Sequence, residues 1–394
     1  MAEREMVALT GNEAGALAFK QIEPDVVAAY PITPQTELMH DVAQFIHDGE
    51  MKTELITVES EHSAMSACIG AASAGARTMT ATSGQGLALM WEMLYIAASY
   101  RLPIVMANVN RALSGPINIH CDHSDAMGAR DTGWIQIYCE NSQEIYDTLI
   151  QAVRIAENER VRLPVMVCYD GFIISHTMQP LKILTKEEVQ EFVGSPKLAF
   201  SLLDVEKPFT LGALDLPPYY YEHKRPQVEA MNNALEVVKS VGEEYGKLSS
   251  RKYGYFEEYK TGDAEFLIVG LGSFTGTAME AIDIVREEGI PAGLLKMRLF
   301  RPLPKEALAE VFKKVKASCV FDRAISFGLG GPLVHELRSV AYEAGSRLPI
   351  ASAIYGLGGR DLTEHDIAEH IRKLWNDYKK GKMTNEPVYL TLCE

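Results

Sequence analysis

The sequence has neither paired cysteines nor an apolar run fit to cross a membrane. Its six cysteines are scattered, with no Cys-x-x-Cys pair and no Cys/His spacing of a zinc or iron–sulfur site. The most apolar stretch, residues 87–109, is interrupted by Glu92, Arg101 and Pro103, which do not fit a membrane span. We therefore expect a chain that carries no metal cluster of its own and does not contact a membrane.

Blocks of basic residues are also missing. The chain has 38 basic and 53 acidic residues, for a net charge of −15, and no Lys/Arg run that could follow a phosphate backbone. Nucleic acid is therefore not an expected partner. The first six residues lack the basic region and apolar stretch of a signal peptide, so the sequence predicts a cytoplasmic protein with reduced thiols.

The length and the periodicity of the chain predict two α/β domains. With 394 residues, it is well above the usual size of a single domain. In the first half, short β-branched or apolar runs alternate with helix-period segments, which indicates a mainly parallel sheet covered on both faces. The predicted strands are 26–30, 55–58, 77–82, 104–109 and 165–170, and the predicted helices are 35–47, 61–74, 87–99 and 143–159.

This pattern weakens between about residues 181 and 260. Proline-containing turn or extended signals at 207–209, 216–221 and 224–226 precede a predicted helix at 226–248, so we expect a linker or wrapping arm. We place a domain boundary between residues 250 and 251, followed by a second, smaller α/β domain. Its predicted strands are 264–270, 292–297 and 319–322, and its predicted helices are 276–288, 303–315, 332–344 and 363–378.

Ligands of open α/β sheets bind at the carboxyl ends of strands, where three polar side chains stand out. Thr33, in Tyr30-Pro-Ile-Thr-Pro34, either caps the next helix or donates a hydrogen bond to a ligand. Glu61 begins a helix and either interacts with the helix dipole or acts as an acid–base group tuned by partial burial. Arg111 either pairs with a nearby acid or grips a carboxylate with two hydrogen bonds. Together these three residues suit a small anionic substrate, but they do not identify the reaction.

Two further motifs contain residue types found in metal or nucleotide sites. Residues 120–125 include His, Cys and Asp, but such short polar runs are more often solvated loops than metal cages. The turn Gly270-Leu-Gly-Ser-Phe-Thr-Gly276 has Thr275 where a dinucleotide fingerprint needs glycine, so we expect a tight turn there. The chain also has no Walker phosphate loop and no Gly-x-Ser-x-Gly nucleophile elbow.

A series of motifs runs through both domains in order. They are Gly11-Asn-Glu-Ala14, Ala29-Tyr-Pro-Ile-Thr-Pro34, Glu59-Ser-Glu61, Thr82-Ser-Gly-Gln-Gly86, Asn110-Arg-Ala-Leu-Ser-Gly-Pro-Ile-Asn118, Asp122-His-Ser-Asp125, Arg130-Asp-Thr-Gly-Trp134, Gly270-Leu-Gly-Ser273, Arg298-Leu-Phe-Arg-Pro302 and Asp322-Arg323. On these residues the chain resembles, over nearly its whole length, the alpha subunit of the multi-subunit pyruvate:ferredoxin oxidoreductases, or pyruvate synthases, in the 2-oxoacid:acceptor oxidoreductase family.

The resemblance implies a thiamine diphosphate-dependent enzyme. Such enzymes decarboxylate a 2-oxoacid, pass single electrons through iron–sulfur clusters to ferredoxin and transfer the acyl group to coenzyme A. The first domain would be the pyrimidine-binding half of the cofactor site, and the second would resemble the transketolase C-terminal domain. Glu61 matches the glutamate that hydrogen-bonds the aminopyrimidine ring nitrogen and favours the imino tautomer. Thr33 and Arg111 match substrate-binding residues, with Arg111 on the carboxylate, and Pro31 and Gln85 are expected to contact the cofactor.

One motif of thiamine enzymes is absent. The diphosphate and its Mg²⁺ are bound by a Gly-Asp-Gly motif followed by paired asparagines, and the chain has no Gly-Asp-Gly. The resemblance thus implies half of an active site, completed by a beta subunit that binds the diphosphate and Mg²⁺. The [4Fe-4S] clusters would lie on partner chains. These partners would include ferredoxin-like gamma and delta subunits, and ferredoxin would be the electron acceptor.

The substrate stays open within this family. Pyruvate is small and singly charged, which suits binding by Thr33 and Arg111. A branched-chain 2-oxoacid would use much the same residues, and one methylene changes the binding free energy by only ~1–3 kcal/mol. A 2-oxoglutarate enzyme needs a second cation, and the Arg111 segment does not resemble that subfamily. An oxalate oxidoreductase needs extra positive charge near Thr33, and none is adjacent. An NAD-dependent dehydrogenase and a noncatalytic scaffold subunit remain as different classes.

Overall fold

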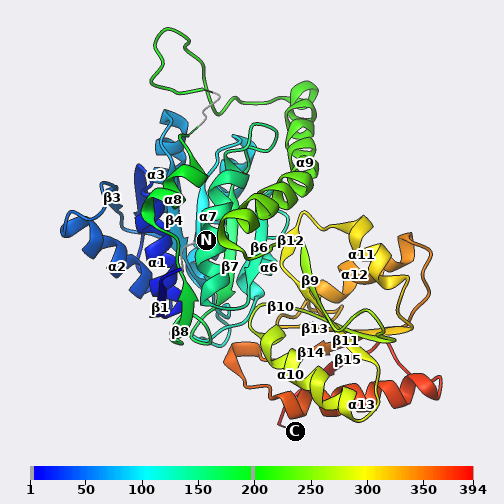
Figure 1. Cartoon of the computed structure of the whole chain (residues 1–394). Helices are drawn as coiled ribbons and strands as arrows, with labels where there is room; N and C mark the ends of the chain where they lie inside the picture. The colour runs from blue at the N-terminus through cyan, green and yellow to red at the C-terminus, as the bar shows by residue number, and fades with distance from the viewer. Residues whose placement is uncertain (1–3, 197–199, 394) are drawn as a thin grey trace.

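The computed structural model describes residues 4–196 and 200–393, which form two α/β lobes (Figure 1). The amino-terminal lobe, blue to green, is built on a seven-stranded sheet, and the carboxyl-terminal lobe, yellow to red, on a six-stranded sheet. An antiparallel pair, β1 (Met6–Leu9) and β8 (Gln179–Lys182), forms a small separate sheet. Among the described residues, no helix is both long and apolar enough to span a bilayer.

The seven-stranded sheet has the order β12-β6-β7-β5-β4-β2-β3. All its pairings are parallel except that of β12 with β6. Every residue of β4, β5, β6 and β7 is buried, as a parallel sheet covered on both faces requires. The strands are β2 (Val26–Ala29), β3 (Glu54–Thr57), β4 (Thr78–Thr82), β5 (Val105–Asn110), β6 (Ile135–Cys139), β7 (Val165–Asp170) and β12 (Leu299–Arg301). The predicted parallel α/β fold is therefore confirmed.

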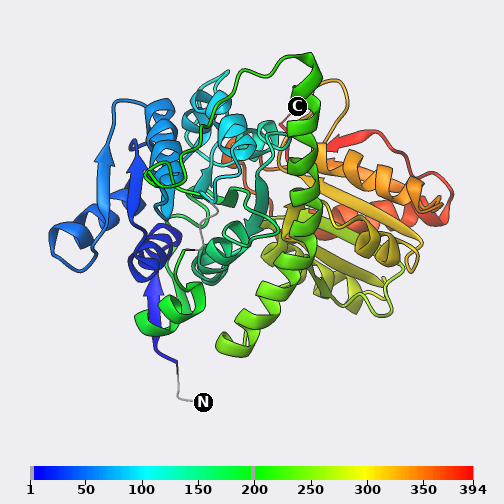
Figure 2. The ribbon, with the colours of Figure 1, turned by 90° about the horizontal axis from the view of Figure 1, so that it is seen from above.

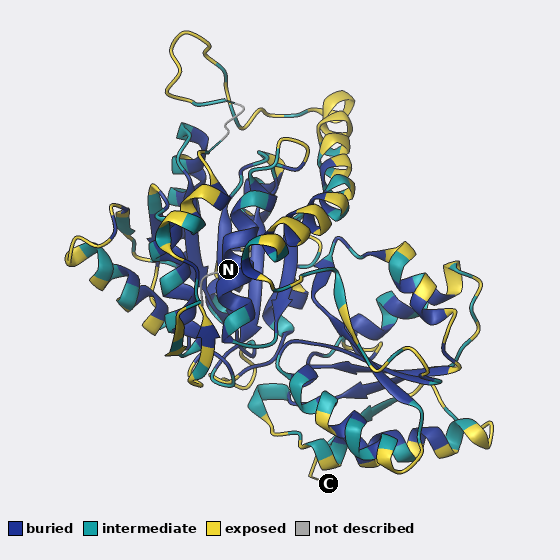
Figure 3. Cartoon of the chain, in the orientation of Figure 1, coloured by how far each residue is buried: buried dark blue, intermediate teal, exposed yellow. Residues whose placement is uncertain are grey.

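Alternate residues of each strand serve two different cores, because side chains of a strand point to opposite faces in turn. Val105 and Ala107 of β5 pack in one core with residues of α1, α2 and α7, whereas Met106 packs in the other with residues of α3 and α5. Figure 3 shows the sheet as the dark, buried layer of the lobe. The helices are α1 (Gly11–Ile22), α2 (Thr36–His47), α3 (Glu61–Ala74), α4 (Gly84–Leu89), α5 (Trp91–Ser99), α6 (Ser124–Gly128), α7 (Ser142–Ala156) and α8 (Lys186–Val193).

The second lobe is a six-stranded sheet of order β15-β14-β13-β10-β11-β9, in which only β9 runs antiparallel to its neighbour. The strands are β9 (Phe256–Tyr259), β10 (Phe266–Leu271), β11 (Ala292–Met297), β13 (Ala317–Asp322), β14 (Ile350–Ile354) and β15 (Pro387–Tyr389). The helices are α10 (Phe274–Glu287), α11 (Lys305–Phe312), α12 (Pro332–Glu343), α13 (Glu364–Lys379) and the 3-10 turn η1 (Leu357–Gly359). The predicted second α/β unit is therefore present.

The expected arm is a loop followed by one long helix. After the loop, α9 (Pro217–Ser249) runs for 33 residues, beside α7 and α5 (Figures 1 and 2). Of the extended or turn structure expected at 216–221 and 224–226, only Leu216 is extended; the rest was wrong, because α9 already begins at Pro217 and contains Pro226. Prolines in the first helical turn lose no hydrogen bond, since those N–H groups have no partner within the helix.

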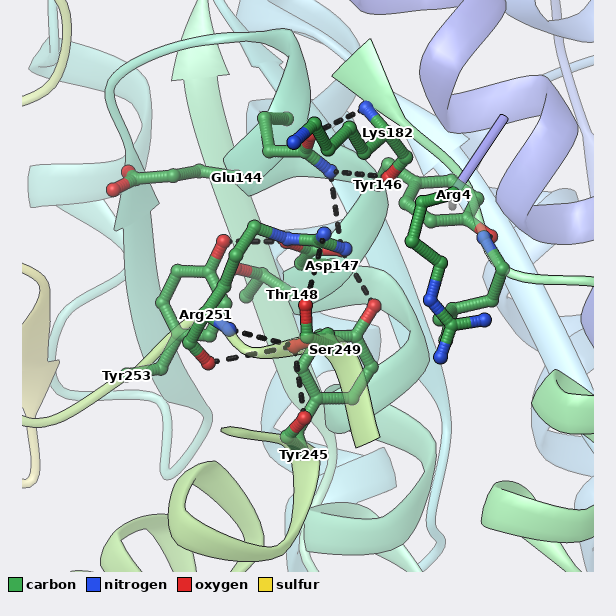
Figure 4. A network of polar contacts seen from close by, with 12 residues as sticks. Arg4, Glu144, Tyr146, Asp147, Thr148, Lys182, Tyr245, Ser249, Arg251 and Tyr253 are labelled. Atoms are coloured by element: carbon green, nitrogen blue, oxygen red, sulfur yellow. Dashed lines mark hydrogen bonds and ion pairs between the residues drawn. The ribbon is translucent and has the colours of Figure 1, made fainter. Parts of the chain in front are cut away.

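The two lobes are joined by more than the arm. β12 comes from beyond the predicted boundary at residue 250, yet it pairs with β6 of the first lobe. Figure 4 shows a second link, in which the buried Asp147 carboxylate of α7 holds the end of the arm and the segment that leads from it into the second lobe. This carboxylate accepts hydrogen bonds from Tyr245 at 2.5 Å, from Tyr253 at 2.5 Å and from Arg251 Nη2 at 2.7 Å. The domain boundary between residues 250 and 251 stays a prediction. We call the hydrogen-bonded group of Asp147, Tyr245, Arg251 and Tyr253 the seam between the lobes.

Candidate active site

Four neighbouring strands of the first lobe deliver their following loops to one edge of the sheet. β3, β2, β4 and β5 are adjacent and parallel, so their carboxyl ends meet at that edge. The predicted residues Pro31 and Thr33 follow β2, Glu61 follows β3, Gln85 follows β4 and Arg111 follows β5. Strand order thus brings together segments that are up to about eighty residues apart in the chain.

Glu61 is the first residue of α3 and is buried, with 6% of its surface exposed. Ser60 caps the helix by accepting a hydrogen bond from the Ser63 N–H, which fixes the first turn and the direction of the Glu61 side chain. In the described ranges 4–196 and 200–393, no side chain or backbone group forms a hydrogen bond or ion pair with the Glu61 carboxylate. A largely buried carboxylate whose hydrogen-bonding capacity is not used by the described part of the chain suits a group that binds a ligand.

The segment 83–86 approaches Glu61 from β4. It comprises Ser83, the N-cap of α4, and the first turn of that helix. A Cβ on Gly86 would lie 2.7 Å from Glu61 Oε1, and a Cβ on Gly84 would lie 3.0 Å from Arg111 Cδ. Two glycines two residues apart therefore let the backbone lie directly between the carboxylate and the guanidinium. Beside them, Thr82 Oγ1 and Gln85 Oε1 are buried without a hydrogen-bond partner among the described residues.

Arg111 is buried, with 7% of its surface exposed, and makes no ion pair within the described part of the chain. The reading of Arg111 as a structural arginine paired with an acid was therefore wrong. Its Nη1 donates to the carbonyl oxygen of Thr33 at 3.0 Å, and its Nε donates to the carbonyl oxygen of Asn118 at 3.0 Å. Burial lowers the pKa of this guanidinium. A buried cation held by neutral carbonyls is suited to bind an anion.

The loop after β2 supplies a backbone group to this cluster. The carbonyl of Thr33 is the acceptor for Arg111, whereas the Thr33 hydroxyl forms no hydrogen bond with any residue that the structure describes. The reading of Thr33 as a helix cap was wrong, because Gln35 occupies the N-cap of α2 and makes no side-chain cap. Pro31 is exposed on the same loop. Gln85 Nε2 donates to Ala112 O at 3.1 Å and so also contacts the segment after Arg111.

Asp125 has a role that sequence reasoning missed, since that reasoning considered it only among the polar residues at 120–125. Its buried carboxylate accepts hydrogen bonds from the backbone N–H groups of Gly84 and Arg111, both at 3.0 Å, and from Asn110 Nδ2 at 2.8 Å. Burial raises its pKa to about 6. One carboxylate thus holds the start of α4 against the end of β5. The motif Asp122-His-Ser-Asp125 was a signal for this residue, but only the fold identifies its donors.

The candidate metal ligands at 120–125 have a different function in the structure. Cys121, His123 and Asp170 bring possible ligand atoms within 4.8 Å of one another. However, Arg323 Nη1 donates to Asp170 Oδ2 at 2.8 Å, and His123 Nε2 lies 2.7 Å from Asp170 Oδ1. Burial alone would raise the pKa of Asp170, but the interactions with His123, Arg323 and Ser273 together lower it below its usual value. The cluster already contains its own cation and does not fit a metal ion.

The Gly270–Gly276 turn is likewise used within the chain. The Ser273 N–H donates to Asp170 Oδ2 at 3.1 Å, and a Cβ on Gly272 would lie 2.9 Å from Asp170 Oδ1. The turn therefore binds a carboxylate of the first lobe in the place where a dinucleotide fingerprint would bind pyrophosphate. This geometry argues against the NAD-dependent dehydrogenase alternative.

The segments that bear the site also carry exposed large hydrophobic residues, namely Tyr30, Leu89, Trp91, Ile117 and Ile119. Exposed apolar residues on segments that also carry polar site groups are typical of surfaces that bind a partner or ligand. Within the described ranges, the arrangement combines a carboxylate without a partner, a buried guanidinium without an acidic partner and buried acceptors without donors. This combination fits a heteroaromatic ring with N–H groups beside a small carboxylate.

Comparison with known proteins identifies the family of this chain. Residues 17–243 match the model for "Pyruvate flavodoxin/ferredoxin oxidoreductase, thiamine diP-bdg", and residues 264–367 match "Pyruvate:ferredoxin oxidoreductase core domain II". The chain is 55% identical to pyruvate synthase subunit PorA of Thermotoga maritima, with 99% of each chain covered. It is 46% identical to ketoisovalerate oxidoreductase subunit VorA of Pyrococcus horikoshii, with 96% of each chain covered.

Two solved structures share the fold. One is a 2-oxoglutarate:ferredoxin oxidoreductase from Magnetococcus marinus with 2-oxoglutarate, coenzyme A and succinyl-CoA bound, at a TM-score of 0.73 and 22% identity. The alignment covers 94% of this chain and 65% of that longer chain. The other is a split-gene transketolase, an inactive beta4 tetramer, at a TM-score of 0.57 and 14% identity, covering 93% of this chain and 97% of that chain. The chain belongs to the pyruvate:ferredoxin oxidoreductase family and matches its PorA subunits over nearly their whole length.

Proposed function

We propose that the chain is the alpha subunit of a pyruvate synthase that converts pyruvate and coenzyme A to acetyl-CoA and CO₂ while reducing ferredoxin, in a reversible reaction. The observation that carries this proposal is the buried residue Glu61, whose carboxylate lies beside Gly86 and has no partner among the described residues. The exposed apolar residues on the segments that bear the site support a site that is completed by a second chain. The names of the PorA relatives support pyruvate as the substrate.

Glu61 would bind the aminopyrimidine ring of thiamine diphosphate. When bound, this cofactor supplies the electron sink for loss of CO₂. The Glu61 carboxyl would share a proton with the ring nitrogen N1′, and its burial would strengthen that hydrogen bond. The absence of a Cβ at Gly86 leaves room for the ring edge next to Oε1. Gln85 Oε1 and Thr82 Oγ1, which lack partners among the described residues, would accept hydrogen bonds from the cofactor; Pro31 would contact it from the β2 loop.

Arg111 would hold the carboxylate of the 2-oxoacid until CO₂ leaves. It is fixed by two carbonyl oxygens and has no acidic partner in the described part of the chain, so its charge remains available to a substrate anion. The Thr33 hydroxyl, which also has no protein partner there, would donate to the same substrate. One cation with one hydroxyl suits a small monoanion better than a dianion such as 2-oxoglutarate.

The remaining parts of the reaction would lie on partner chains. A beta subunit would bind the diphosphate and Mg²⁺, since this chain has no Gly-Asp-Gly motif. The [4Fe-4S] clusters would lie on partners that include gamma and delta subunits, which would pass electrons to ferredoxin, with coenzyme A as cosubstrate. All six cysteines are free thiols in the structure, which is consistent with a reducing cytoplasmic location. In calorimetry, the isolated chain should not bind thiamine diphosphate with micromolar affinity.

A branched-chain 2-oxoacid is the second candidate substrate. The VorA relative at 46% identity is nearly as similar as the Methanocaldococcus jannaschii PorA at 48%, which covers 95% of this chain and 96% of that one. Both substrates would use the same Arg111 contact, and the extra methyl groups are distinguished by only ~1–3 kcal/mol per methylene. Oxalate would require further positive charge beside Thr33.

The decisive experiment is a substrate panel on the assembled enzyme. Dye-coupled reduction of a viologen would be measured with pyruvate, 2-oxobutyrate, 2-oxoisovalerate, 2-oxoglutarate and oxalate, each with coenzyme A where the reaction needs it. We expect the highest kcat/KM for pyruvate and measurable activity with 2-oxobutyrate. A higher kcat/KM for 2-oxoisovalerate would assign the chain to the ketoisovalerate enzymes. No activity with any 2-oxoacid would contradict the proposed function.

A further inference from the structure

We propose that the second lobe positions Arg111 for the substrate through Asn118, with the turn η1 as the contact. This inference rests on the proposed role of Arg111. It gives the second lobe a part in substrate binding, although none of the residues assigned to the site belongs to it. The connection consists of two hydrogen bonds in series. Arg111 Nε donates to the carbonyl oxygen of Asn118, and Asn118 Nδ2 donates to the carbonyl oxygen of Gly358, both at 3.0 Å.

Asn118 is fixed on both sides of its amide. While Nδ2 donates to Gly358, Oδ1 accepts a hydrogen bond from the His120 N–H at 2.7 Å. The side chain therefore has one orientation that satisfies both partners. Because the carbonyl that binds Arg111 belongs to the same residue, a shift of Asn118 would move one of the two acceptors that orient the guanidinium.

Two further contacts tie the same loop to the second lobe. The Gly359 N–H donates to the carbonyl oxygen of Cys121 at 2.8 Å, and the His123 N–H donates to the carbonyl oxygen of Arg323 at 2.8 Å. The loop that follows Arg111 is thus hydrogen-bonded to the second lobe at residues 118, 121 and 123. By contrast, residues 114–117 are exposed, so the part of the loop that orients Arg111 is the part held from outside its own lobe.

The turn is shaped for close approach. Gly356, Gly358 and Gly359 all have positive φ, at 63°, 60° and 81°. A Cβ on Gly358 would lie 2.4 Å from Asn118 Nδ2, and a Cβ on Gly359 would lie 2.5 Å from His120 Cβ. The left-handed backbone conformation is enough to explain why glycine occurs at these positions. It does not explain why Gly358 and Gly359 lie so close to Asn118 and His120. Gly381 has a similar φ of 66° and nothing within 4 Å of its would-be Cβ.

The consequence for binding follows from the environment of Arg111. A buried guanidinium that grips a carboxylate with two parallel hydrogen bonds depends on its in-plane orientation. Thr33 O and Asn118 O fix two of its nitrogen atoms, which leaves the rest of the fork for the ligand. Losing the Asn118 contact would free one edge of the group. Misplacement by about 1 Å can cost roughly 100-fold in rate.

The test uses Gly358→Ala and Asn118→Ala in the assembled enzyme, with Gly381→Ala as the control. A Cβ at position 358 would meet only the amide group at the end of the Asn118 side chain, and this group can be pushed aside. The Gly358→Ala chain should therefore fold. We expect both variants to raise the KM for pyruvate by roughly 10- to 100-fold, with the KM for coenzyme A unchanged. Gly381→Ala adds the same left-handed strain without the contact and should leave both KM values as in the wild type.

A double-mutant cycle with Arg111→Lys separates this inference from the proposed function. If Asn118 acts through Arg111, the effects of Asn118→Ala and Arg111→Lys on the KM for pyruvate should be far from additive. An unchanged KM in Arg111→Lys would overturn the proposed role of Arg111. A raised KM in Arg111→Lys, together with a wild-type KM in both Gly358→Ala and Asn118→Ala, would overturn the positioning role alone. Additive effects, or an equal rise in the KM for coenzyme A, would also overturn it.

Discussion

The carboxylate of Glu61 occupies the space that a side chain at Gly86 would need, although the two residues follow different strands. A Cβ at position 86 would lie 2.7 Å from Glu61 Oε1 and 2.6 Å from Thr82 Oγ1. Both distances are far below van der Waals contact. Every side chain larger than hydrogen at position 86 would therefore displace the carboxylate or fill the space next to it.

Gly86→Ala should abolish most activity of the assembled enzyme while the chain still folds. The added methyl group would push against Glu61 and occupy the space expected for the ring of the cofactor. The matched control is Gly70→Ala in α3, where a Cβ would meet nothing within 4 Å. Because alanine favours a helix more than glycine does, the Gly70→Ala variant should be more stable to unfolding by about 0.5–1 kcal/mol. Viologen reduction and thermal unfolding would be measured for both variants. Equal activity in the two variants would contradict the expected crowding.

Glu61→Gln should lower kcat by roughly 10²- to 10⁴-fold, the usual share of acid–base catalysis, with assembly of the complex intact. The amide keeps the shape of the side chain but cannot exchange a proton with the cofactor. Glu59→Gln is a fitting control, since Glu59 is exposed and lies two residues earlier. The measurements are pyruvate-dependent viologen reduction and gel filtration. Wild-type kcat in Glu61→Gln would support the noncatalytic scaffold alternative.

Asp147→Asn tests the seam between the lobes (Figure 4). Burial raises the pKa of Asp147, while the hydrogen bonds and charge of Arg251 oppose this effect. Removing the negative charge leaves Arg251 unpaired beside two tyrosines, so the free energy of unfolding should fall by about 3–5 kcal/mol. Glu244→Gln breaks the more exposed pair of Glu244 with Arg154 and should cost less than ~1 kcal/mol. Urea unfolding would compare the two, and similar losses would contradict this ranking.

His370 should make the second lobe sensitive to acid. Burial lowers its pKa from 6.5 to about 4, and its Nε2 has no hydrogen-bond partner among the described residues. Between these pH values the unfolded chain binds a proton that the folded chain does not, so the free energy of unfolding falls as pH falls. His370→Leu should reduce this loss of stability, whereas His365→Leu, on the exposed face of α13, should not. Thermal unfolding across this pH range would check both, and identical profiles would refute the role of His370.

The parts of the fold that were predictable are those with a strong local period. β5 and β7 are apolar and bounded by turn residues, so their positions follow from the sequence alone. The carboxyl-end rule then brought Thr33, Glu61 and Arg111 to one edge. In contrast, α9 was placed to begin nine residues too late, because prolines that read as turn signals at 217 and 218 also fit the first turn of a helix.

The parts that could not be predicted depend on contacts between distant segments. Arg111 could pair with an acid or bind a ligand, and only the coordinates show two carbonyl partners and no carboxylate within the described residues. Asp125 and Asn118 are ordinary polar residues of a loop until their partners are known. No local pattern distinguishes a carboxylate that organises two backbone segments from one that faces solvent.

The pairing of β12 with β6 restricts how this chain could be divided or recombined. A first lobe produced without residues 299–301 would expose one side of β6 as an unprotected edge, and such edges promote association with other chains. A hybrid that exchanges second lobes between relatives would have to supply a matching β12, in register with Ile137 and Gln136. Among the described residues, the only sheet neighbour of β12 is β6, which lies in the amino-terminal half of the chain. Substitutions in β12 must therefore remain compatible with β6.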